Sequence, residues 1–397
     1  MKNESVAILD IRSNEISFLL GSNGVNGTFV FKGACSEKYS GFSTTSLQII
    51  EKESFQRAIT KVIDVVRKNY VGTIKEIFVG VPSWAVSVRT KGQTNSYPSK
   101  RKISSQDVDA LYASGLNELT SFGKCIRYSN MYFALGDNRK YFSVGDIYGI
   151  STTMLNGGLS YYFIDETFYA TTDALLRSLG FLDVYYVPST LAQAQYLFSE
   201  KQREGYAFLL DIGYAASSIS VVYGNGIVHE ETFPFGIVTI IDGLKNKFDV
   251  SSVIAEEMLA AASVSGGSSY EDVPWYGENE EISYSIKEIN EQVKCTLDVL
   301  CEDVAKFFDK HYKEKNVMSL TVNPIGITGD GIGYIKGVGE HVSKQLNMLT
   351  EIVAPDLPYY DKTVYSSRIS LLDIALLDKN KQSWIYKIFN IIGGKRK

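Results

Sequence analysis

Two segments of the chain, about 200 residues apart, share one pattern of hydrophobic and polar positions. The apolar runs Val6–Ile11 and Ala207–Ile212 each carry an aspartate next to their last residue, Asp10 in the first and Asp211 in the second. A second apolar run follows after four residues in the first segment and after six, at Ile219, in the second. Apolar runs separated by polar and Gly/Asn turns predict antiparallel hairpins. Because apolar strands resemble one another, two unrelated hairpins are the alternative to a repeat.

Helices and strands alternate between and after these segments. Apolar residues at 3–4 spacing predict helices at 55–66, 250–262 and 282–312, whereas residues 76–81 form a buried strand that ends at Pro82. Alternating Trp84, Val86 and Val88 predict a further strand, which opens a segment with its own strands and one helix. This pattern indicates an α/β protein with a small α+β module inserted after Pro82.

Composition excludes several classes of protein. The chain has 45% hydrophobic and 21% charged residues and a net charge of −5, which excludes a disordered, fibrous or polybasic chain. Four dispersed cysteines and three histidines indicate neither a disulfide framework nor a zinc site. No apolar run approaches the roughly 18–20 residues of a membrane span. We therefore expect an intracellular protein.

The C-terminal segment differs from the rest in charge. The last 17 residues hold five lysines and arginines and no acid, which leaves −10 on the remainder. On a helical wheel, its apolar residues fall within an arc of about 160°; they are Trp384, Ile385, Ile388, Phe389, Ile391 and Ile392, flanked by Lys387, Lys395, Arg396 and Lys397. A helix docked on the protein core would show the same stripe, but basic flanks and an aromatic residue favour an interfacial membrane anchor.

The duplicated hairpins also indicate a chemistry. Backbone N–H groups in hairpin turns can bind phosphate oxygens. Asp10 and Asp211 can hold Mg²⁺ through water, and the turn at Gly329–Gly333 can approach a base and ribose closely. Each feature taken alone is weak evidence, and a lone strand-end aspartate is more often a cap. Together they predict a nucleotide bound between two lobes.

At this point the chain resembles the actin, Hsp70 and sugar-kinase superfamily. The residues that carry this resemblance are Asp10–Asn14, Leu210–Ser217 and Ile327–Gly331, in the positions of two phosphate loops and an adenosine motif. Within the superfamily the chain is most similar to the bacterial cell-division family FtsA. That likeness is carried by the insertion after Pro82, residues 145–150, 179–192 and 233–236, and Ala255–Glu256.

The resemblance implies a two-lobed actin-like ATPase fold with duplicated ribonuclease-H-like cores, an inserted module and a C-terminal amphipathic helix. The implied divisions are a first-lobe core at 1–82, 163–192 and about 366–378, the module at 83–162, a second-lobe core at 193–240 and 314–365, its subdomain at 241–313, and a linker and membrane helix at 379–397. ATP and Mg²⁺ are the implied cofactors. Asp10 and Asp211 would hold Mg²⁺, and the nucleotide-binding residues would be Arg12, Ser13, Asn14, Gly213, Tyr214, Ala215, Ala216, Ser217, Gly236, Glu256, Gly329, Asp330 and Gly331.

The sequence departs from the family pattern in its phosphate motifs. Arg12 takes the place of a glycine, and Ala215, Ala216 and Ser217 stand where a glycine and a threonine are usual. Asp330, Ile237 and Leu259 replace a glycine, a glycine and a lysine. Arg12 could pair with a phosphate, or it could fill the pocket and abolish binding. No residue stands out as a general base, so we expect a weak ATPase at most, with the nucleotide as an assembly switch.

The resemblance also implies a role and partners. A division protein of this kind would form head-to-tail filaments with itself and tether the tubulin-like FtsZ to anionic lipid on the cytoplasmic side of the membrane at the septum. The region around 241–312 would receive the FtsZ tail, and the module would contact a neighbouring subunit and later division proteins. Two alternatives remain: an FtsA-like cytoplasmic platform protein of a type IV pilus machine, and a metabolic kinase or chaperone ATPase.

Overall fold

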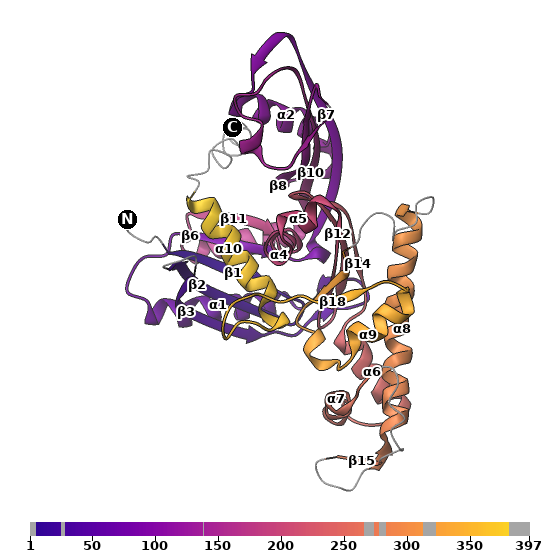
Figure 1. Cartoon of the computed structure of the whole chain (residues 1–397). Coiled ribbons are helices and arrows are strands. Elements are labelled where there is room, and N and C mark those ends of the chain that lie inside the picture. Colours follow the sequence, from indigo (N-terminus) through magenta and orange to yellow (C-terminus); the bar gives the residue numbers. More distant parts are fainter. Residues whose placement is uncertain are drawn as a thin grey trace.

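The computed structural model describes residues 5–24, 28–137, 139–265, 274–277, 283–312 and 323–380. Two lobes, each built on a five-stranded sheet, lie side by side in the middle of the molecule (Figure 1). A module with its own sheet extends at one end, and the helices of the second lobe extend at the other (Figure 1). This arrangement is the two-lobed α/β fold that the sequence predicts.

The sheet of the first lobe combines a meander with two parallel strands. In chain order its strands are β1 (Val6–Ile11), β2 (Glu15–Asn23), β3 (Phe29–Lys38), β6 (Glu76–Val81) and β11 (Asp183–Pro188). They lie in the order β11-β6-β1-β2-β3. The pairs of β1 with β2 and of β2 with β3 are antiparallel, whereas β6 runs parallel to β1 and to β11. The central parallel strand β6 is buried on both faces and therefore reads as a continuous apolar run.

The sheet of the second lobe repeats this topology. Its strands are β12 (Ala207–Ile212), β13 (Ser217–Tyr223), β14 (Gly226–Phe233), β17 (Ile325–Thr328) and β18 (Thr350–Ile352), in the order β14-β13-β12-β17-β18. Again the first three are antiparallel and the last two run parallel to the first. The hairpins are therefore equivalent parts of two equivalent sheets, and the alternative of unrelated hairpins is wrong.

The structure corrects the length of the second turn. Ile11 pairs with Ile16, and Ile212 pairs with Ser217, so each turn holds four residues. Ser217 was expected in the turn because it is polar, but it is the first residue of β13 and is buried. Hydrophobicity located the strand two residues late, at Ile219, because a buried polar residue can belong to a strand when its hydrogen bonds are satisfied.

Helices cover both faces of each sheet. On the first lobe, α1 (Lys52–Asn69) and α3 (Glu166–Ser178) pack on the face that holds Leu9 and Ile11. The opposite face, with Val6 and Ile8, is covered by α10 (Ser366–Asn380), beside α4 (Ser189–Leu197). Since side chains alternate along a strand, Asp10 lies on the same face as Val6 and Ile8, toward α10.

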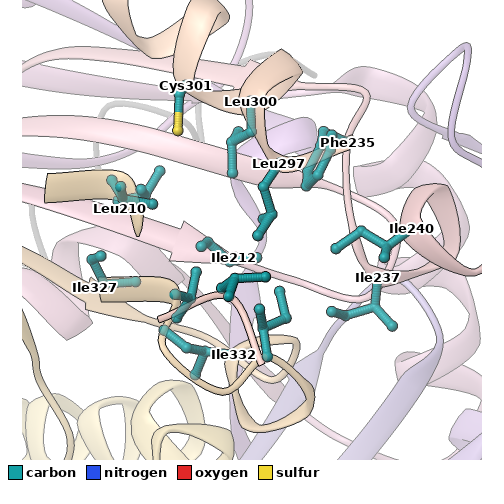
Figure 2. Packing of buried hydrophobic residues seen from close by; sticks show 14 of the residues in the cluster. Leu210, Ile212, Phe235, Ile237, Ile240, Leu297, Leu300, Cys301, Ile327 and Ile332 are labelled. Carbon is teal, nitrogen blue, oxygen red and sulfur yellow. The ribbon is translucent and has the colours of Figure 1, made fainter. Parts of the chain in front are cut away.

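The second lobe carries the largest apolar cluster of the described residues. It joins Leu210, Ile212 and Ile327 of the sheet to side chains from four helices, and Figure 2 labels those of two of them, such as Ile240 and Leu297. These helices are α6 (Ile237–Phe248), α7 (Ser252–Ala261), α8 (Ile286–Tyr312) and α9 (Val338–Leu346). On the other face, Phe198 packs near Leu209 and Val353, next to the short α5 (Glu200–Glu204). The phosphate-loop candidates at the end of β12 are thus fixed by a rigid core.

The inserted module is a four-stranded antiparallel sheet with one helix. Its strands are β7 (Val86–Lys102), β8 (Cys125–Leu135), β9 (Lys140–Tyr141) and β10 (Ser151–Ile164), in the order β7-β10-β8-β9, and its helix is α2 (Ser105–Asn117). Trp84 does not belong to the strand, as its alternation with Val86 predicted, but to a 3₁₀ turn at Ser83–Ala85. The remaining short strands are β4 (Phe42–Ser43), β5 (Gln48–Ile49), β15 (Pro274–Tyr276) and β16 (Ser283–Ser285).

The module contacts both lobes. Arg127 on β8 makes a two-pronged ion pair with Asp378 near the end of α10, with N–O distances of 2.8 and 3.2 Å. On the other side, the hydroxyl of Ser160 donates to the carbonyl of Ile227 on β14 at 2.8 Å. The module therefore fixes the last turn of α10 and one edge of the second-lobe sheet.

Candidate functional site: the cleft between the lobes

The candidate site lies where the two hairpins face each other. The equivalent strands β1 and β12 end at the same interlobe cleft, and their turns, 12–15 and 213–216, approach from opposite sides. Six of the predicted residues line a cavity there: Arg12, Ser13, Asp211, Gly213, Ala216 and Asp330. Residues from three sequence segments more than 100 positions apart therefore meet as the repeat predicts.

Arg12 crosses the cleft from the first lobe to the second. Its guanidinium donates two hydrogen bonds to the carboxylate of Asp211, both at 3.1 Å, and a third to Asp330 Oδ1 at 3.3 Å. All three side chains are largely buried, with exposed fractions of 14, 10 and 15%. Burial opposes the charged guanidinium, but Asp211, Asp330 and Asp10 outweigh this effect and raise the pKa of Arg12 above its ordinary value. Arg12 is thus a fixed cation between two carboxylates of the other lobe.

The turn that carries Arg12 is itself held in place. The backbone N–H of Arg12 donates to the carbonyl of Glu15 at 2.9 Å, and the carbonyl of Arg12 accepts a hydrogen bond from the hydroxyl of Tyr39 at 2.8 Å. Beside it, Ser13 Oγ accepts a hydrogen bond from the backbone N–H of Ala215 at 3.0 Å. The backbone N–H of Ala215, which the sequence predicted to bind phosphate, therefore binds the first turn instead.

The two aspartates of the repeat have different surroundings. Asp211 also accepts a hydrogen bond from Gln193 Nε2 at 2.9 Å, so three protein donors engage its carboxylate. Asp10 faces α10 and accepts a hydrogen bond from the hydroxyl of Ser367 at 2.6 Å. Burial raises the pKa of Asp10, although Arg12 and Arg368 act in the opposite direction. Asp10 is not among the residues that line the cavity.

The other predicted residues mostly build the turns. A side chain on Gly236 would overlap the carbonyl of Tyr214, and one on Gly329, whose φ is +118°, would overlap the carbonyl of Ile212. The N–H of Gly331 also donates to Ile212, at 2.9 Å. Elsewhere, the hydroxyl of Ser217 donates to the carbonyl of Phe235 at 2.9 Å, and the carbonyl of Asn14 accepts from the N–H of Tyr39 at 3.0 Å.

Glu256 is not brought into the cavity. It is exposed on α7, outside the cavity lining. The predicted membrane-binding residues lie outside the described residues: Trp384, Ile385, Lys387, Ile388, Phe389, Ile391, Ile392, Lys395, Arg396 and Lys397.

Sequence reasoning missed several contributors to the cleft. Ser189, Thr190 and Gln193 line it from the start of α4, and Ser218 lines it from β13. The signal for the first two was the polar pair that directly follows the parallel strand β11, since residues at the carboxyl end of a parallel strand face a ligand crevice. Ser367 contacts Asp10 from 357 positions away in the sequence, and no local pattern marks it.

The arrangement does not fit a nucleotide with Mg²⁺ as it stands. The cavity holds about 30 Å³, room for roughly one or two water molecules, whereas small-molecule sites measure roughly 300–1,000 Å³. The guanidinium lies against Asp211, where a second cation would be repelled. Within the described residues, no group of three or more His, Cys, Asp or Glu could hold a metal ion. Asp211 and Asp330 are both paired with Arg12, Asp211 through both of its oxygens and Asp330 through Oδ1.

Comparison with known proteins shows the fold. No protein-family model and no curated protein matches the sequence. Among solved structures, the PilM–PilN type IV pilus biogenesis complex matches with a TM-score of 0.60 at 12% identity, over 94% of this chain and 98% of that one. MreB5 of Spiroplasma citri bound to ADP gives a TM-score of 0.55 at 9% identity, over 96% and 99%.

A third solved structure, the ethanolamine utilization protein EutJ from Carboxydothermus hydrogenoformans, gives a TM-score of 0.50 at 11% identity, over 95% and 90%. Chains of such low identity share an architecture and not a demonstrated activity. Together with the duplicated sheets and the facing hairpins, these matches show that the chain has the two-lobed actin-like fold.

Proposed function

We propose that this chain is an actin-like scaffold that attaches to a membrane through its C-terminal segment and holds partner proteins there. The observation that carries the proposal is the point at which that segment leaves the body. The last described helix, α10, packs on the first-lobe sheet, and its final turn is tied down by the ion pairs of Asp378 with Arg127 and of Lys379 with Glu76. The basic, apolar segment that follows therefore starts from a fixed position.

The character of the C-terminal segment supports the membrane part. Its apolar stripe, basic flanks and lack of acids suit an anionic lipid surface, to which each basic residue contributes about 1 kcal/mol. The body carries a net charge of −10 and would be repelled by the same surface. Within the described residues, no helix is long and apolar enough to cross a membrane. Attachment through one short helix is weak, so assembly into filaments would strengthen it by avidity.

The cleft supports the scaffold part. Of the described carboxylates that line it, Asp211 and Asp330 are both paired with Arg12, which favours binding of partners over turnover of a substrate. MreB5 of Spiroplasma citri is described as bound to ADP and, in a second structure, to AMPPNP. If ATP and Mg²⁺ act on this chain, they do so as an assembly switch and only after Arg12 has left Asp211 and Asp330.

The scaffold part of this proposal fits two kinds of protein, of which only the first needs the membrane attachment. The first is a division protein that forms filaments with itself and tethers FtsZ to the septal membrane, with the FtsZ tail bound near residues 241–312. The second is a platform protein of a type IV pilus machine, favoured by the match to a PilM–PilN complex over nearly the whole of both chains. The two differ in their use of the C-terminal segment, since the platform would not depend on a lipid anchor.

Sedimentation with anionic liposomes tests the membrane role. The full chain should sediment, and a chain that ends at Gln382 should lose most of this binding. A matched variant, Ile388→Glu with Ile391→Glu, keeps the length and removes the apolar stripe, and it should also stay in the supernatant. Equal sedimentation of the full and shortened chains would leave the tether without support and favour the platform.

Two further measurements separate the remaining functions. Binding of a fluorescent FtsZ C-terminal peptide to the full chain supports the division role, and its absence alongside retained lipid binding counts against it. Robust ATP turnover with a small acceptor, abolished by Asp211→Ala, would instead indicate the kinase or chaperone alternative.

A further inference from the structure

We infer that Arg12 is a built-in substitute for a nucleotide: it joins the two phosphate-loop turns across the cleft and excludes Mg-ATP from the wild-type chain. The fold is that of nucleotide-binding proteins, but the cleft of this chain is filled by its own groups. The fold places two turns and two aspartates around a cleft, but in this chain side chains and backbone groups of those same turns bind each other. The inference does not depend on a membrane role, and its test contains no lipid.

The first line of support is the set of groups that Arg12 engages. Asp211 is the penultimate residue of the buried strand β12 and Asp330 follows β17, and both belong to the second lobe, whereas Arg12 belongs to the first. A guanidinium with a two-pronged carboxylate pair and a third hydrogen bond is a directional contact. The backbone of Arg12 is itself hydrogen-bonded to Glu15 and Tyr39, so the side chain extends into the cleft from a fixed starting point.

The second line of support is the backbone of the opposite turn. The N–H of Ala215 donates to Ser13 and is therefore not available to an anion. The N–H of Gly213 donates to the carbonyl of Ala216 at 3.2 Å within its own turn. A phosphate nest needs successive N–H groups that point outward together. In the turn 213–216, two of the four N–H groups already donate to groups of the protein.

The third line of support is the charge balance. The cleft gathers Asp211 and Asp330 around a single guanidinium, with Asp10 close enough to affect its pKa. A triphosphate would bring further negative charge beside these carboxylates and would compete with them for Arg12. The Mg²⁺ that accompanies ATP would meet carboxylates already paired with a cation and would be repelled by it, so Mg-ATP could bind only where Arg12 is removed or moved. The same hydrogen bonds that join the lobes therefore exclude the ligand.

The chain offers a matched control for Arg12. Arg127 makes the same kind of two-pronged pair, with Asp378, at similar burial, with exposed fractions of 17 and 13%. This second pair joins the module to α10 and lies outside the cleft. Loss of Arg127 should therefore cost comparable stability without any effect on the nucleotide site.

Calorimetric titration of the full-length chain with Mg-ATP provides the test. The wild type and Arg127→Ala should show no saturable binding, whereas Arg12→Ala and Arg12→Gln should gain an affinity at least about tenfold above any residual wild-type binding. The neutral variant Arg12→Gln keeps a side chain of similar reach and guards against misfolding of the alanine variant. Circular dichroism establishes that each variant is folded.

Hydrogen exchange supplies a second, ligand-free readout. Without nucleotide, the amides of residues 213–217 should be protected in the wild type and in Arg127→Ala, and should exchange faster in Arg12→Ala. Tight binding of Mg-ATP by the wild type that weakens in Arg12→Ala would overturn the inference, because Arg12 would then be a phosphate ligand. Folded Arg12 variants that bind no Mg-ATP and exchange like the wild type would overturn it as well.

Discussion

The two hairpins of this protein have the same backbone and opposite roles. In β1–β2, Asp10 pairs with Ser17, and in β12–β13, Asp211 pairs with Ser218, so the strands and the four-residue turns correspond position by position. The residue two places after the aspartate is Arg12 in the first copy and Gly213 in the second. The first copy therefore supplies a long cationic side chain, and the second supplies the space and the carboxylate that receive it.

This difference shows how a duplicated fold can lose the symmetry of its site without losing its architecture. A side chain on Gly213 would overlap the carbonyl of Ala216 and stand 3.3 Å from Asp330 Oδ1. Arg12 has no such restriction, since its side chain extends across the cleft. One turn position therefore distinguishes the copy whose side chain crosses the cleft from the copy that leaves room for it.

The largest effect should distinguish the two aspartates. Asp211→Asn removes the main partner of Arg12 and leaves a largely buried charge with only Asp330, which should lower the free energy of unfolding by about 3 kcal/mol. Asp10→Asn should cost only about 1 kcal/mol, because burial already favours the neutral form and the amide oxygen can still accept from Ser367. Urea unfolding of both variants checks the order, with Asp378→Asn as a control outside the cleft. A larger loss for Asp10→Asn would contradict the assigned roles.

The next effect concerns the space left by the second copy. Gly213→Ala should cost about 2 kcal/mol, because its Cβ would press on the backbone of Ala216 and on Asp330. Gly92→Ala is a suitable control, since no atom lies within 4 Å of a Cβ built there. Thermal unfolding of the pair should show a clear decrease in melting temperature for the first variant only. Similar melting temperatures would mean that the second turn can relax, and that a glycine is not needed there.

The sequence predicted the architecture better than it predicted the state of the site. Buried strands such as residues 76–81 and the repeated aspartates are local patterns, and the structure confirms the duplicated two-lobed fold that they indicate. The sequence also singled out Arg12 as the unusual residue and left open whether it would bind phosphate or fill the pocket. Which of the two roles Arg12 takes depends on Asp211 and Asp330, which are 199 and 318 positions away in the sequence. A local sequence pattern does not show that these residues lie within hydrogen-bond distance across the cleft.

Other parts of the site were beyond sequence reasoning for a similar reason. Ser367 and Gln193 are ordinary polar residues of helices, and only the packing of α10 and α4 brings them to the two aspartates. Trp84 alternates with apolar neighbours as a strand residue would, but the chain turns there as it enters the module. Periodicity reports which face of an element is buried, and it does not report which element lies opposite.

The smallest predicted effect separates the two sheets by pH. Leu19 lies opposite Ala34 in the first sheet, whereas the equivalent Ser220 lies opposite Glu230 in the second and donates to its Oε1 at 3.1 Å. Burial raises the pKa of Glu230 from 4.5 to about 7.

Between these two values the folded chain holds a proton that the unfolded chain has lost, so the contribution of Glu230 to stability is present below about pH 4.5 and falls as the pH rises to about 7. Glu230→Gln cannot ionise, so its stability should depend less on pH. From about pH 5 to pH 8, the free energy of unfolding of the wild type should fall by about 1–2 kcal/mol more than that of Glu230→Gln, as measured by urea unfolding. Parallel pH profiles for the two chains would show that the carboxyl of Glu230 is solvated in the folded state.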